Sequence, residues 1–189
     1  MTATLLAGFV FLIGTVFDMY LCILITRVIL AWRRSNAAGP MGQFIIKLTR
    51  PIVYPLKKWI RDLGNIETAS LVLIFFLEMI KWFLILLPIA IPHVLGLIIL
   101  SIGDALELTL DIFFYAILLQ AILSWVQPGS PMNRFLQDIT APIIQPFQRL
   151  IPPIGGLDIS PIPALIVLQL LMIILTEPVT MLGRSIAFG

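Results

Sequence analysis

Residues 5–31 read LLAGFVFLIGTVFDMYLCILITRVILA, an apolar run broken only by Asp18, Arg27 and a few small or hydroxyl-bearing residues. An α-helix needs about 20 apolar residues to cross the hydrocarbon core of a bilayer, which is about 30 Å thick. The run is longer than the hydrophobic part of a cleavable signal peptide, and no basic residues precede it. It therefore predicts a retained membrane span.

The composition of the whole chain supports the same interpretation. Of its 189 residues, 60% are hydrophobic and 12% are charged, whereas soluble domains have about 45–50% apolar and about 25% charged residues. A chain this short cannot bury such an apolar excess, so much of it must face lipid. Three further apolar stretches, at about 69–88, 94–126 and 161–182, complete an all-α membrane protein of about four spans. Gly103 and acidic residues interrupt 94–126, which predicts either one long tilted helix or two pieces.

Two amphipathic segments separate these spans, at residues 40–61 and 131–151. In the first, apolar residues recur at helical spacing with basic residues between them, and Trp59 lies near its end. This pattern is typical of a helix that lies in the membrane interface. Pro51 predicts a break that divides the segment into two pieces. The candidate surface for lipid or a partner consists of Lys47, Arg50, Lys57, Lys58, Arg61 and Arg149.

The sequence around the amphipathic segments occurs twice. Thr49-Arg-Pro-Ile-Val-Tyr-Pro55 returns 91 positions later as Thr140-Ala-Pro-Ile-Ile-Gln-Pro146, and Asp18 and Trp32 return 93 positions later as Asp111 and Trp125. This spacing predicts two tandem units, residues 1–92 and 93–189, with the same orientation and a pseudo-two-fold axis along the membrane normal. The repeated structural residues are Pro51, Pro55, Gly64, Glu67, Pro142, Pro146, Gly155 and Asp158.

The repeated motif has a structural interpretation. Its paired prolines fix how the surface segment enters and bends, and its glycines allow the left-handed backbone of a turn into the next span. Glu67 and Asp158 are expected to accept hydrogen bonds from free amides at the start of that span. The motif predicts either a repeated corner without a ligand, or basic surface helices that bind anionic lipid or a partner.

This doubled pattern, Thr-x-Pro-x-x-x-Pro followed by basic residues and Gly-x-Ile/Leu-Asp/Glu before an apolar helix, resembles the YggT family, which includes YlmG and related chloroplast proteins. The resemblance covers about residues 5–182. It implies a bacterial inner-membrane protein without established enzymatic activity. It also implies links to osmotic or extracytoplasmic stress and ion homeostasis, to cell division and envelope organisation and, in plastids, to haem attachment.

The basic residues predict the orientation of the chain. Seven of the twelve Lys and Arg residues lie between Arg33 and Arg61, and short loops rich in such residues stay in the cytoplasm. With four spans, both long loops are then cytoplasmic. Both termini and the turn at Pro88–His93 would face the periplasm.

Charged residues within the spans are costly and are therefore candidates for function. Glu78 and Lys81 are three positions apart on one helix and can pair. Lys81 also lies at a depth comparable to that of Asp18, which allows a second pair. Arg27, near the cytoplasmic end of the first span, is expected to extend its side chain to the interface.

The third span carries Asp104, Glu107 and Asp111 on one face, without a basic residue in the same helix. One hypothesis is that these carboxylates line an outward-facing groove that admits a cation or a proton. The alternative is a structural role, in which Asp104 and Glu107 lie among outer headgroups. Asp111 would then be protonated or hydrogen-bonded to Gln120, Gln169 or Thr109.

The sequence contains no nucleotide loop, nucleophile–base pairing or metal motif, and its single cysteine allows no intrachain disulfide. We therefore predict a protein that is not an enzyme, needs no cofactor and does not bind nucleic acid directly. The first hypothesis is a scaffold or assembly factor that binds anionic inner-leaflet lipid and organises envelope membrane proteins, as a homo-oligomer or alone. The second is an oligomeric channel or transporter component for cation and osmotic balance.

Overall fold

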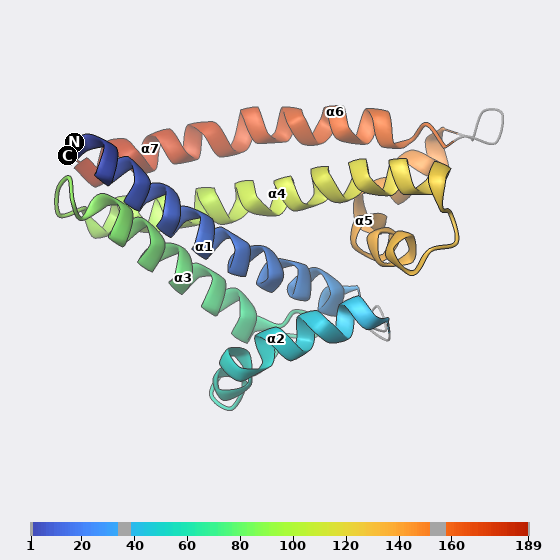
Figure 1. Ribbon diagram of the computed structural model, residues 1–189, viewed down its shortest axis with the longest axis horizontal. Helices are drawn as coiled ribbons and strands as arrows, with labels where there is room; N and C mark the ends of the chain where they lie inside the picture. The colour runs from blue at the N-terminus through green and yellow to red at the C-terminus, as the bar shows by residue number, and fades with distance from the viewer. Residues whose placement is uncertain (1, 34–38, 152–157, 189) are drawn as a thin grey trace.

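A computed structural model describes residues 2–33, 39–151 and 158–188. Within these ranges the chain forms helices and turns but no β-strand, and a single bridge joins Leu63 to Ile66. Figure 1 shows the elements in chain order. They are α1 (Thr2–Trp32), α2 (Pro40–Lys57), α3 (Thr68–Leu86), α4 (Val94–Val126), α5 (Pro131–Leu150), α6 (Pro161–Leu171), the π-helical turn η1 (Met172–Thr176) and α7 (Glu177–Phe188).

Four of the helical segments are long and apolar enough to cross a membrane. They are α1, α3, α4 and the continuous segment α6–η1–α7 over Pro161–Ala187. Each one coincides with a predicted span, and α4 is a single helix of 33 residues rather than two pieces. The fourth segment extends to Ala187, five residues beyond its predicted end at residue 182.

The spans form two pairs. Helices α1 and α3 lie side by side and are inclined to α4, which runs along α6 and α7 (Figure 1). Both termini and the turn between α3 and α4 lie at one end of the molecule, and α2 and α5 lie toward the opposite ends of their spans. The two amphipathic segments are therefore on the same side of the four spans.

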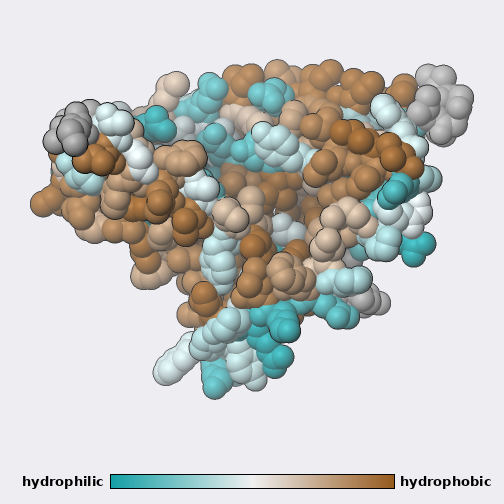
Figure 2. Space-filling model, viewed as in Figure 1, coloured by the Kyte–Doolittle hydropathy of each residue, from teal (hydrophilic) through white to brown (hydrophobic). Residues whose placement is uncertain are grey.

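Contacts between the pairs form the main core. Leu21 and Leu24 of α1 pack in one buried cluster with Ile117 of α4, Ile144 of α5 and Leu168 of α6. Many other large apolar side chains of the spans are exposed. Figure 2 shows this apolar surface over the long helices, with hydrophilic residues over α2 and α5. An apolar surface of this extent is suited to lipid rather than water.

Helices α4 and α7 approach closely near the termini because glycine faces the partner helix. A Cβ atom on Gly96 would lie 2.4 Å from the backbone of Ala187, and one on Gly183 would lie 2.8 Å from the backbone nitrogen of Leu100. Small residues allow such backbone contact between membrane helices, where packing takes over from the hydrophobic effect as the main attraction.

The predicted break at Pro51 is wrong. Helix α2 runs without interruption from Pro40 to Lys57 with Pro51 and Pro55 inside it, and it ends before residue 61. Helix α5 likewise contains Pro142 and Pro146. Pro51 and Pro55 are both exposed, so the carbonyl groups that lose a partner face outward, where water or headgroups can satisfy them.

Candidate functional site

A buried ion cluster joins α1, α2 and the start of α3. The Glu67 carboxylate accepts two hydrogen bonds from Arg27, from Nε to Oε2 at 2.7 Å and from Nη2 to Oε1 at 2.9 Å. It also accepts from the Ser70 hydroxyl at 2.6 Å and pairs with the Lys57 ammonium at 2.5 Å. Arg27 Nη1 donates to the Thr49 hydroxyl at 2.6 Å. We call these five residues the Arg27–Glu67 cluster.

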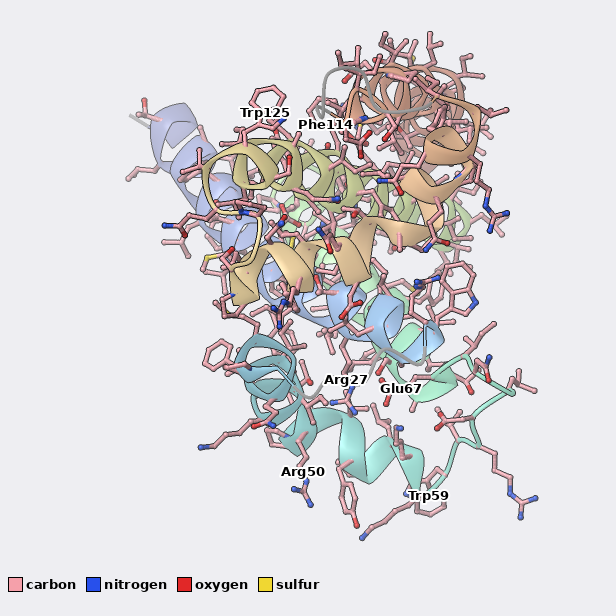
Figure 3. The ribbon with its side chains drawn as sticks, turned by 90° about the vertical axis from the view of Figure 1, so that its right-hand side faces the viewer. Arg27, Arg50, Trp59, Glu67, Phe114 and Trp125 are labelled. Atoms are coloured by element: carbon pink, nitrogen blue, oxygen red, sulfur yellow. The ribbon has the colours of Figure 1, made fainter. Side chains whose placement is uncertain are left out.

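The Arg27–Glu67 pair at the centre of the cluster is shielded from solvent, whereas the Lys57 side chain is 34% exposed. Glu67 is 6% exposed, and Figure 3 shows Arg27 and Glu67 meeting at the corner between the helices. Burial by itself raises the pKa of Glu67, but hydrogen bonds from Arg27, Lys57 and Ser70 outweigh it and lower the pKa to about 2. Burial lowers the pKa of Lys57, but the hydrogen bond and charge of Glu67 reverse this and leave the pKa raised. A buried charge is tolerated when its partners are in place.

One expectation for this corner is wrong, because the Glu67 side chain binds other side chains instead of capping the amides of α3. The extension of Arg27 to the interface stays a prediction, and its side chain reaches Thr49 of α2 and Glu67 at the start of α3. Gly64 does adopt the left-handed backbone, with φ of 64°. Gly155, its predicted counterpart, lies outside the described residues. Asp158 confirms the capping expectation, since its Oδ1 accepts from the Ser160 amide at 2.9 Å.

A second cluster lies inside the spans and is centred on Lys81. Its ammonium is 2.7 Å from Oδ1 of Asp18 on α1 and 2.8 Å from Oε2 of Glu78 on α3, and it also pairs with Asp104 on α4. The Trp82 indole donates to Oδ2 of Asp104 at 2.9 Å. Both pairings expected from the sequence are present. The contact with Asp104, which was not expected from the sequence, makes Lys81 the link between three helices.

The other two acids of α4 have a different environment. Glu107 and Asp111 line a cavity of about 290 Å³ together with Gln169, Thr176 and Glu177. Among its described lining residues there is no Lys or Arg. The predicted acidic face of the third span is therefore divided, because Asp104 pairs with Lys81 and the other two face α6, η1 and α7.

The three side chains expected from the sequence to bond Asp111 lie in different surroundings. Gln169 lines the cavity with it, whereas Gln120 accepts a hydrogen bond from the Thr140 hydroxyl. Thr109 donates to the carbonyl oxygen of Ala105 at 2.7 Å. Of the three side chains named from the sequence, Gln169 is the one that shares the surroundings of Asp111.

The basic residues of α2 form an exposed surface outside the spans. Arg50 and Lys58 flank the ring of Tyr54, at 5.5 and 6.0 Å from its centroid. Figure 3 shows Arg50 and Trp59 pointing away from the spans. Lys47 and Arg61 are also exposed, whereas Lys57 is turned into the Arg27–Glu67 cluster. Arg149 is exposed on α5. We call Lys47, Arg50, Lys58 and Arg61 the basic face of α2.

In the part of the chain that the structure describes, no group of three His, Cys, Asp or Glu side chains is arranged to hold a metal ion. The four apolar spans and the charged clusters that join them define a multi-pass helical membrane protein. The model of the CCB3/YggT family matches the chain at residues 6–88 and at residues 99–179. The chain belongs to this family.

Its relatives have similar lengths. An uncharacterised protein of Pseudomonas aeruginosa is 36% identical, over 92% of this chain and 91% of its own. A protein encoded in the proC 3' region of Vibrio alginolyticus is 35% identical, over 84% and 88%. The uncharacterised protein YggT of Escherichia coli K12 is 32% identical, over 95% of both chains. No solved structure matches the chain.

Proposed function

We propose that the protein is a non-enzymatic scaffold or assembly factor of the bacterial inner membrane, which organises envelope proteins under osmotic or envelope stress. The observation that carries the proposal is the basic face of α2. Its four cations are exposed outside the spans, while the Arg27–Glu67 cluster fixes the helix to α1 and α3. A charged surface held in one orientation is suited to docking.

The same helix has the chemistry of an interfacial segment. Phe44, Ile52 and Trp59 are exposed beside the basic residues, and each Lys or Arg near an anionic leaflet contributes about 1 kcal/mol of attraction. A cytoplasmic position for α2 and α5 follows from the excess of basic residues in the first long loop. Both termini would then be periplasmic.

We infer that the chain consists of two tandem units in the same orientation. Three observations support this. The family model matches twice, once in each proposed unit. Thr49 and Thr140, 91 positions apart, are both fully buried. Leu24 and Ile117, 93 positions apart, are both fully buried as well. The units would be related by an axis along the membrane normal.

The scaffold proposal is tested by reversing the charge of the basic face. A variant with Lys47, Arg50, Lys58 and Arg61 all replaced by Glu is compared with one in which Lys and Arg are exchanged at the same positions. We expect the reversed variant to lose its partners in a mild-detergent pull-down and to fail to restore osmotic tolerance to a deletion strain. The exchanged variant should retain both. Unchanged partners and tolerance in the reversed variant would contradict the proposal.

A second candidate function is an oligomeric cation channel or transporter component. It is favoured by the cavity with Glu107, Asp111 and Glu177 in its lining. The Lys81 cluster argues against it, because Asp18 and Asp104 are already paired with a tethered ammonium. Purified protein in liposomes should pass cations only if the channel hypothesis is correct, and Asp111→Asn should then abolish the flux. An absence of cation flux from folded protein in the liposomes would contradict the channel hypothesis.

A further inference from the structure

A polar cavity of about 310 Å³ lies at the corner between α4, α5 and α6. Its lining includes the side chains of Gln120, Ser124, Thr140, Gln148 and Asp158. Among the lining residues that the structure describes, Asp158 is the one carboxylate, and there is no Lys or Arg. The described lining contains no residue of the basic face of α2, so an inference about the cavity does not depend on the proposed function.

The Arg27–Glu67 cluster provides a template for this corner. At the spacing of the repeat, Arg27 corresponds to Gln120, Thr49 to Thr140, Lys57 to Gln148 and Glu67 to Asp158. Two of the contacts recur with a neutral side chain in place of the cation. The Thr140 hydroxyl donates to the Gln120 side-chain oxygen, whereas the Thr49 hydroxyl accepts from Arg27. Gln148 Nε2 donates to Asp158 Oδ2 at 2.8 Å where Lys57 pairs with Glu67.

The third contact of the template is missing. Arg27 reaches Glu67 through two hydrogen bonds, but Gln120 is shorter than arginine and Asp158 is one methylene shorter than glutamate. The Gln120 oxygen is also engaged by Thr140. Gln120 and Asp158 both line the cavity, so the space lies where an arginine side chain would otherwise complete the corner.

We propose that this cavity is a binding site for a guanidinium group, which Asp158 holds as Glu67 holds Arg27. A planar guanidinium presents paired N–H donors that match a carboxylate, and its remaining donors need acceptors such as amide and hydroxyl oxygens. The cavity offers both. A hard divalent cation would require more carboxylate oxygens than the lining supplies. The guanidinium comes either from a small molecule or from an arginine of another polypeptide.

Hydrogen bonds from neighbouring residues keep the Asp158 carboxyl group in its charged form. Burial raises the pKa of its carboxyl, but hydrogen bonds from Ser160 and Gln148 outweigh burial and leave the pKa below its usual value. Asp158 is therefore anionic at neutral pH. No basic residue of the described lining neutralises it, so a bound cation would encounter an uncompensated carboxylate.

The site is tested with the full-length protein in lipid nanodiscs, using methylguanidinium as the probe and methylurea as its neutral counterpart of similar shape. We expect methylguanidinium to raise the unfolding temperature in a saturable manner and methylurea to have no such effect. Asp158→Asn should weaken binding by at least about tenfold, because hydrogen bonds to charged groups are the stronger ones. An equal response to methylurea, unchanged binding by Asp158→Asn, or no response to methylguanidinium would overturn the proposal.

A filling variant provides an independent test. Gln120→Arg should place a guanidinium in the cavity from within the chain, raise the unfolding temperature above that of the wild type and remove the response to methylguanidinium. Gln120→Met, which is of similar size but uncharged, should not raise the unfolding temperature and should still bind the probe. A Gln120→Arg protein that binds methylguanidinium as tightly as the wild type would overturn the assignment.

The source of the guanidinium is distinguished by photo-crosslinking from position 124 in living cells. A polypeptide adduct that disappears in the Gln120→Arg background would identify an arginine of a partner as the occupant. If purified protein binds methylguanidinium but cells give no adduct, the occupant is a small guanidinium compound.

Discussion

Arg27 and Glu67 are 40 residues apart in the sequence, yet they face each other through two parallel hydrogen bonds of 2.7 and 2.9 Å. The pair connects the end of the first span to the start of the second, and Thr49 and Lys57 bring α2 into the same contact. The corner is therefore a single unit, in which removal of one member leaves the others buried without their partner.

Arg27→Gln should destabilise the protein strongly. Removing one partner of a buried ion pair costs about 3–5 kcal/mol, and we expect the lower end of this range because Glu67 remains paired with Lys57. Thermal unfolding in mild detergent measures the effect. In the double variant Arg27→Gln/Glu67→Gln, the loss should be smaller than the sum of the two single losses. Additive losses would show that the two residues act independently.

The stability contributed by Glu67 should depend on pH. Its pKa in the folded protein, about 2, is below its ordinary value of 4.5, so the contribution is fully present above about pH 4.5 and is lost as the pH falls toward 2. The shift corresponds to about 3 kcal/mol at neutral pH. Unfolding temperatures measured across this interval should fall more steeply for the wild type than for Glu67→Gln. Parallel curves would contradict the prediction.

Lys81→Met should destabilise the bundle more than Asp18→Asn. The first change leaves three carboxylates on α1, α3 and α4 without their cation, whereas Asp18→Asn leaves Lys81 paired with Glu78 and Asp104. The residues 91 positions after Lys81 and Glu78 are Met172 and Gln169. The double variant Lys81→Met/Glu78→Gln, which copies them, should recover part of the loss. Unfolding in detergent checks the order of the three variants.

Gly96→Ala should weaken the packing of α4 against α7. The added Cβ would lie 2.4 Å from the Ala187 backbone, which cannot yield as a flexible side chain can. We expect a loss of about 1–3 kcal/mol, as for other overpacked contacts. Gly8→Ala is the matched control, because a Cβ there meets nothing within 4 Å. Equal unfolding temperatures for the two variants would contradict this account.

The four spans were predictable from the sequence because the bilayer imposes a strict requirement on each stretch of sequence that crosses it. A helix that crosses a bilayer must carry about 20 apolar residues in succession, and residues 94–126 satisfy this despite their acids. The continuity of α2 through Pro51 was not predictable from a local rule. It depends on which face of the helix is exposed, and tertiary packing decides that.

The charged clusters were predictable only in part. Glu78 and Lys81 follow from helical spacing within one span. The pairing of Arg27 with Glu67, and of Lys81 with Asp104, depends on how separate helices are rotated about their axes. The hydropathy of α1, α3, α4 and α6 is nearly uniform around each helix, so it contains little information about that rotation. The division of Asp104 from Glu107 and Asp111 could not be predicted for the same reason.

The unequal lengths of α3 and α4 have a consequence for the membrane itself. With 19 residues, α3 is about 28 Å long and matches a hydrocarbon core of about 30 Å, whereas α4, with 33 residues, is about 50 Å long. Lys81 of α3 and Asp104 of α4 hold the two helices together at one level. Helix α4 must therefore lean or project into the headgroups, and a thinner or thicker bilayer changes the angle at which the two pairs of spans diverge.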